Sequence, residues 1–147
     1  GKERSSFNPS LRAKFIEFVE TLQTKDCSFL DKTFKDFDFS NLGQDDFVYA
    51  DPPYRISCGS YNDGKRGFEG WSEQDDLALF EILDELNERN IHFALSNVIE
   101  HKGQQNILLN EWRQRYHTHF LNANYSNSNY QCKEKKTRTV EVLITNY

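Results

Sequence analysis

Short apolar runs and helical apolar patterns alternate along this chain, and their order restricts the fold more than any other feature. Residues 47–50 and 91–95 are runs of the kind that forms strands buried on both faces of a sheet. Between them, leucines and isoleucines recur at helical spacing over residues 79–86, and Ser72 with Asp75 makes a capping signal ahead of them. This strand–helix–strand order predicts an α/β sheet with crossover helices.

The C-terminal part adds one helix and two more strands to this pattern. Residues 104–114 have apolar residues at helical spacing, residues 117–121 alternate like a strand, and residues 140–144 form a last apolar run. The polar stretch 122–138 between the last two strands has no helical pattern. We therefore expect these two strands to pair antiparallel at one edge of a mixed sheet, with the helices on its faces.

Length and composition exclude several classes of protein. A chain of 147 residues forms one domain, and a net charge of -5 does not suit binding of nucleic acid by overall charge. Three cysteines without a CxxC pair and four scattered histidines indicate neither a disulfide framework nor a metal site. The chain contains no apolar run long enough for a membrane span and no apolar signal core, so we expect a cytoplasmic protein that is not in a membrane.

The stretch DFVYADPPYR, residues 46–55, carries the candidate chemistry. Asp51 follows a predicted strand at its carboxyl end, where open α/β sheets bind ligands. Pro52 and Pro53 hold a rigid turn and leave their carbonyls free as acceptors. Asp51 and the Pro52 carbonyl can accept the two N–H bonds of an exocyclic amine, while Tyr54 stacks on the ring, a contact worth about 1–3 kcal/mol. The alternative is an ordinary turn that ends a strand.

These residues and their flanks resemble a known family. DFVYADPPY resembles the catalytic motif of Dam-like, S-adenosylmethionine-dependent adenine-N6 methyltransferases of DNA. SYNDGKRGFEGWSEQDDLALFEIL resembles the loop and helix after that motif, and FALSN and RTVEVLITNY resemble the later strands. ERSSFN resembles the end of the target-recognition segment, so residues 1–25 are its expected tail. The resemblance covers nearly all of residues 1–147 and implies a single domain, a partial Rossmann-like methyltransferase sheet equal to the C-terminal half of the family fold.

The resemblance also implies a reaction and a set of site residues. The target adenine is extruded from double-stranded DNA, because its amine is out of reach inside the stack, and it attacks the sulfonium methyl of S-adenosylmethionine. The implied roles are catalysis by Asp51, Pro52, Pro53 and Tyr54, and cofactor binding by Asp51 and Tyr49. Tyr61, Ser96 and Asn97 are candidates for binding the base. Ser96 and Asn97 suit a helix cap or an Asx turn equally well.

A basic segment near the C-terminus is the candidate DNA contact. Lys133, Lys135, Lys136 and Arg138 follow a stretch with interleaved tyrosines and asparagines. Basic groups beside aromatic rings suit a DNA backbone and an opened base. The alternative is a solvated run of charge, which is common for lysines.

Several alternatives to the leading function stay open. The glycine-rich cofactor turn and the ribose-binding acid of the family have no counterpart here, so we expect weak binding of S-adenosylmethionine and little activity from this chain alone. A second chain that supplies the N-terminal cofactor-binding half is one explanation; a remnant of a restriction–modification enzyme is another. The substrate amine could belong to RNA or protein, although such enzymes more often have Asn where this chain has Asp51. A noncatalytic assembly or nucleic-acid-binding subunit is the remaining alternative.

Overall fold

The computed structural model describes residues 7–57, 70–121 and 139–147. The chain divides into two compact units, Gly1–Thr33 and Phe34–Tyr147, which are described separately. None of the helices within the described residues is long and apolar enough to cross a membrane. The prediction that residues 1–147 form one domain stays a prediction.

The described part of the first unit contains one helix, α1 (Pro9–Gln23). Two residues define its start: Asn8 is the N-cap, with its Oδ1 accepting the Leu11 N–H at 2.9 Å, and Pro9 occupies the first turn. The helix has no buried residue, and Phe15 and Phe18 are more than half exposed. Most of the apolar side chains of this helix are therefore exposed.

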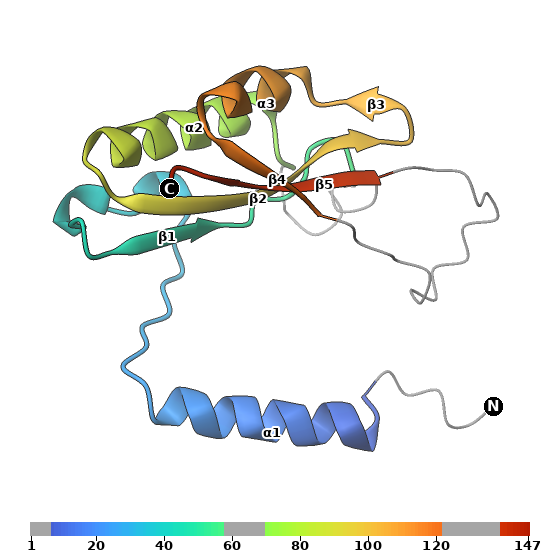
Figure 1. The fold of residues 1–147 in the computed structure, drawn as a ribbon. Coiled ribbons are helices and arrows are strands. Elements are labelled where there is room, and N and C mark those ends of the chain that lie inside the picture. Colours follow the sequence, from blue (N-terminus) through green and yellow to red (C-terminus); the bar gives the residue numbers. More distant parts are fainter. Residues whose placement is uncertain (1–6, 58–69, 122–138) are drawn as a thin grey trace. The chain divides into compact units, whose positions relative to one another are not determined.

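The second unit is built on a mixed sheet (Figure 1). Its strands are β1 (Phe47–Ala50), β2 (His92–His101), β3 (Gln104–Gln105), β4 (His117–Leu121) and β5 (Thr139–Thr145). The spatial order is β1-β2-β5-β4, and β3 pairs with the end of β2. Strand β1 runs parallel to β2, whereas β5 is antiparallel to both β2 and β4. The predicted mixed sheet with an antiparallel edge pair is confirmed.

Two α-helices cover one face of this sheet. They are α2 (Glu73–Glu88) and α3 (Ile107–Trp112), and Figure 1 shows both on the same side of the strands. Outside the gaps at residues 58–69 and 122–138, the unit also contains three short 3-10 turns, η1 (Phe34–Asp36), η2 (Phe39–Asn41) and η3 (Arg113–Arg115). The described part of the second unit has no α-helix on the opposite face. Helix α3 is shorter than the predicted span because β3 takes its first residues and Asn106 caps it.

The core lies between these helices and the inner face of the sheet. Helix α2 contributes Leu83 and Leu86, and strand β2 contributes Phe93 and Leu95, all at most 1% exposed. Trp112 stacks on Phe80, with ring centroids 4.5 Å apart. The apolar stripe that the sequence predicts for α2 is therefore the buried face of the helix.

Strand β1 differs from the prediction that it is buried on both faces. Phe47 and Tyr49 are 54% and 59% exposed, while Val48 and Ala50 pack against the core. Successive side chains of a strand point to opposite faces, and within the described part of the second unit only the inner face carries α-helices. The apolar run suggested two-sided burial, but the side chains of Phe47 and Tyr49 are exposed on the outward face.

Candidate active site at the end of strand β1

Asp51 lies where the chain leaves the parallel strand pair. Ala50 is paired with Leu95, so continuing the register places Asp51 level with Ser96 on β2. Asp51 is exposed, and Pro52 and Pro53 are half-buried. The motif therefore stands at the carboxyl end of β1, the edge at which open α/β sheets bind their ligands.

The Tyr54 hydroxyl joins the motif to the neighbouring strand. It donates to Asp51 Oδ1 at 2.8 Å, and its oxygen lies 2.8 Å from Ser96 Oγ. Because a phenol has one proton, a hydroxyl that donates to Asp51 accepts its second bond from Ser96. A turn closed by the Ser57 N–H on the Tyr54 carbonyl, at 2.9 Å, holds the backbone after the tyrosine. The structure thus brings Asp51, Tyr54 and Ser96 together.

This environment keeps Tyr54 neutral well above physiological pH. Partial burial is the main cause that raises the pKa of Tyr54 to about 12, and the Asp51 carboxylate raises it further, whereas the bond from Ser96 acts in the opposite direction. At neutral pH the hydroxyl is therefore a hydrogen-bond donor to Asp51. The aromatic ring is held in place through its hydroxyl end.

Tyr54→Phe is expected to destabilise the chain by about 1 kcal/mol near pH 7, because it removes hydrogen bonds to Asp51 and Ser96. The pKa of Tyr54 is higher in the folded state, so this stabilisation is present below the ordinary pKa of 10.0 and is lost as pH rises through about 12. Urea unfolding of both proteins from pH 7 to pH 12 measures the difference. Burial also raises the pKa of Tyr116, but this residue is present in both proteins, so its contribution cancels in the difference between their unfolding free energies. A difference that stays constant up to pH 12 would contradict the assignment.

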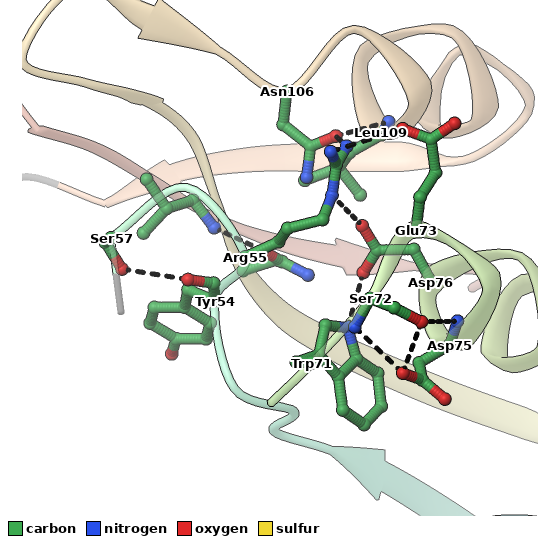
Figure 2. Close-up of polar contacts among 12 residues, drawn as sticks. Tyr54, Arg55, Ser57, Trp71, Ser72, Glu73, Asp75, Asp76, Asn106 and Leu109 are labelled. Carbon is green, nitrogen blue, oxygen red and sulfur yellow. Dashed lines mark hydrogen bonds and ion pairs between the residues drawn. The ribbon is translucent and has the colours of Figure 1, made fainter. Parts of the chain in front are cut away.

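A second cluster adjoins the motif on its C-terminal side (Figure 2). Arg55 donates from Nε to Asp76 Oδ2 at 2.9 Å and from Nη2 to Asn106 Oδ1 at 3.0 Å. Its Nη1 lies 3.2 Å from Glu73 Oε2. Trp71 Nε1 donates to Asp76 Oδ1 at 2.8 Å, and Asp76 is 1% exposed. This cluster is built from α2, the start of α3 and the segment after Tyr54.

The sequence did not predict this cluster, although one signal for it was available. Asp76 precedes Leu79, Phe80 and Leu83 by three, four and seven residues, which is the spacing of one helix face. An acid on the apolar face of a helix is buried, and a buried carboxylate needs partners. The identity of those partners, Arg55 and Trp71, requires the fold.

The other predicted site residues lie in different surroundings. The sequence suggested that Ser96 and Asn97 lie beyond the end of the second strand. In the structure, β2 extends to His101, so both residues are inside the strand. Because successive residues of a strand face opposite sides, Ser96 meets Tyr54 while Asn97 is 1% exposed, with its Oδ1 accepting the Val98 N–H at 2.7 Å. Tyr49 is exposed on the outward face of β1. Five candidates lie outside the described residues: Tyr61, Lys133, Lys135, Lys136 and Arg138.

Known proteins resemble this chain over most or all of its length. A family model described as D12 class N6 adenine-specific DNA methyltransferase matches residues 1–138. Type II methyltransferase M.FokI of Planomicrobium okeanokoites is 48% identical over 147 residues, which is 100% of this chain and 22% of that protein. Modification methylase StsI of Streptococcus sanguinis is 48% identical over 149 residues, which again is 100% of this chain and 22% of that protein. Modification methylase LlaI of Lactococcus lactis subsp. lactis is 38% identical over 109 residues, 74% of this chain and 16% of that protein. The chain spans about a fifth of the length of these relatives.

Proposed function

The chain belongs to the D12 class of N6 adenine-specific DNA methyltransferases, and we propose that its part in the reaction is to bind the target adenine and present the amine to a methyl donor. The relatives named as modification methylases support a role in a restriction–modification system. The DNA is double-stranded and the adenine is extruded from it, because the amine cannot be reached inside the stack.

The contact of Tyr54 with both Asp51 and Ser96 carries this proposal. It places an exposed carboxylate and an aromatic ring together at the carboxyl end of a parallel strand. Asp51 Oδ1 is used by Tyr54, which leaves Oδ2 for a substrate N–H. An acceptor beside a flat ring suits a planar base with an amino group.

Two acceptors on the amine account for its reactivity. The Asp51 carboxylate and the Pro52 carbonyl each accept one N–H, which draws the nitrogen lone pair out of conjugation with the base. A bound methyl donor would supply the carbon that this nitrogen attacks, and Asp51 would take the proton that the nitrogen loses and pass it to solvent. The chain contributes mainly by holding the reacting amine in line, since well-oriented reactants gain large effective concentrations. Pro53 keeps the turn rigid, and Tyr54 stacks on the base.

S-adenosylmethionine, as the methyl donor, would supply an electrophilic methyl group on a sulfonium. The residues present fit one end of it: Asp51 is an exposed carboxylate that can bind a cationic amino group, and the Tyr49 ring is 59% exposed two residues earlier. We assign cofactor contacts to these two residues and base contacts to Ser96 and Tyr61, whereas Asn97, which is buried on the other side of β2, can only support the strand that carries Ser96. A second chain or further residues would hold the rest of the donor.

The basic segment is proposed to bind the DNA backbone. Replacing Lys133, Lys135, Lys136 and Arg138 by glutamine is expected to weaken binding to every duplex. The slope of log K against log salt should flatten by about 0.9 for each phosphate that the variant no longer neutralises. Fluorescence anisotropy with one labelled duplex over a range of salt measures this. A slope that does not change would remove the assignment.

A chimeric enzyme tests the proposed function directly. The chain replaces the 147 residues that it matches in the Planomicrobium okeanokoites relative, because it spans only 22% of that protein. The chimera and the 147-residue chain are each incubated with S-adenosylmethionine and unmethylated genomic DNA. N6-methyladenine is then measured by mass spectrometry of the digested DNA. Methyl transfer by the chimera supports the proposal. A stable chimera that binds DNA and transfers no methyl group contradicts it.

A further inference from the structure

We propose that Arg55 and Asp76 are positioning residues: their buried ion pair fixes the direction in which the chain leaves Tyr54, and thereby holds Asp51 and Tyr54 in the geometry that receives the adenine. The role assigned here rests on the proposed function. The anchoring of the motif by these residues does not depend on activity and can be measured separately.

Asp76 is the fixed point of this arrangement. It lies in the first turns of α2 on the buried face of the helix, and it is 1% exposed. Both carboxylate oxygens are occupied, Oδ2 by Arg55 Nε and Oδ1 by Trp71 Nε1. A buried carboxylate is tolerated only when such partners surround it, so its position dictates where Arg55 and Trp71 lie. One carboxylate therefore ties Arg55, in the segment after Tyr54, and Trp71, just before α2, to the same point of the helix.

Arg55 extends the anchoring to a second helix. Its Nη2 donates to Asn106 Oδ1, the same atom that caps α3 by accepting the Leu109 N–H at 3.1 Å. Its Nη1 contacts Glu73 at the start of α2. A planar guanidinium held at three nitrogens has one allowed orientation, which a lysine ammonium cannot reproduce. Figure 2 shows the Arg55 side chain reaching Asp76 and Asn106 from the segment after Tyr54.

Tyr54 is therefore held from two sides. Its hydroxyl is bound by Asp51 and Ser96 at the sheet, and its backbone continues directly into the anchored Arg55. Loss of the ion pair frees the backbone side only, so the ring and the Asp51 carboxylate can shift while the core stays packed. A displacement of about 1 Å at a reacting centre can cost about 10²-fold in rate.

The same helix offers a matched control. Asp84, also on α2, accepts Trp112 Nε1 at 2.9 Å, Arg115 Nη2 at 2.9 Å and the Tyr116 hydroxyl at 2.6 Å. It repeats the acid–tryptophan–arginine chemistry of Asp76 with partners from α3 and the segment after it. Asp84→Asn therefore damages a cluster of the same chemistry that does not join the motif, on a side chain that is 28% exposed where that of Asp76 is 1% exposed.

The first measurement uses the 147-residue chain and requires no activity. The ring carbon that bears the hydroxyl is labelled with ¹³C in all seven tyrosines, and the Tyr54 signal is assigned from Tyr54→Phe. Asp76→Asn and Arg55→Lys are expected to move the Tyr54 signal and leave that of Tyr116 in place. Asp84→Asn should do the reverse. A Tyr54 signal that ignores Asp76→Asn and Arg55→Lys, in chains with native circular dichroism, would overturn the proposal. If Asp76→Asn does not fold, the Tyr54 signal of Arg55→Lys alone decides whether the ion pair anchors Tyr54.

The second measurement uses the chimera. Asp76→Asn and Arg55→Lys are expected to lower kcat about 10²-fold and to change the dissociation constant for DNA by less than about 3-fold. Asp84→Asn should keep kcat within about 3-fold of the parent. An equal fall in kcat for Asp76→Asn and Asp84→Asn would reduce Asp76 to a stabilising residue and overturn the proposal. A parent chimera without methyl transfer contradicts the proposed function, and the tyrosine signals still decide whether Asp76 anchors Tyr54.

Discussion

Replacing Asp51 by alanine is expected to lower methyl transfer by the chimera about 10³-fold, within the range of about 10²–10⁴-fold seen when a group that binds or deprotonates the reacting atom is removed. The carboxylate is the charged acceptor for the amine, and its Oδ1 also receives the Tyr54 hydroxyl. Loss of the Asp51 carboxylate removes the acceptor for the amine and, at the same time, the hydrogen bond that holds the Tyr54 ring. Single-turnover transfer of a labelled methyl group to DNA measures the chemical step without product release.

Two further variants separate the reasons for the loss. Asp51→Asn keeps the shape and one acceptor oxygen and loses the charge, so it should retain more activity than Asp51→Ala. Asp46→Ala is the matched control: this carboxylate accepts the Gly43 N–H at 2.7 Å just before β1 and should leave methyl transfer within about 3-fold. Methyl transfer unaffected by Asp51→Ala would contradict the proposed chemistry and favour a noncatalytic subunit.

The parts of the site that the sequence predicted are those determined locally. Asp51 stands at the end of an apolar run whose neighbours, two prolines, fix the backbone, so its place needs no knowledge of the rest of the chain. The capping box of α2 is equally local, with Ser72 and Asp75 bound reciprocally as predicted. The antiparallel pairing of β4 and β5 follows from the lack of a helical pattern between them.

The missed parts are determined by contacts between distant segments. Strand β2 was predicted to end at residue 95, because the polar residues that follow interrupt the apolar run. In the structure, β5 pairs with it as far as His101, and the ladder of backbone bonds continues regardless of side-chain polarity. The partners of Asp76 come from both sides of residues 58–69, and no local pattern connects them. The long β2 has a functional consequence, since it carries Ser96 inside a rigid strand.

Phe93→Ala is expected to destabilise the second unit by about 3–5 kcal/mol, a large part of the stability of a domain of this size. Phe93 is fully buried on β2, and its ring lies 5.1 Å from that of Tyr116 and 6.1 Å from that of Trp112. Removing it leaves a cavity where α3 meets the sheet.

Phe47→Ala on the adjacent strand is the control for this prediction. Phe47 is 54% exposed. Among the described ring contacts it has one, an edge-to-face pair with Tyr147 whose ring centroids are 6.2 Å apart. Its removal should cost about 1 kcal/mol or less. Urea unfolding followed by circular dichroism compares the two variants, and equal losses of stability would contradict the one-sided burial of β1.

Phe93→Ala is also expected to loosen the contact between Ser96 and Tyr54 before the unit unfolds, because Ser96 lies three residues beyond Phe93 on the same strand. The ¹³C signal of the Tyr54 ring reports this change.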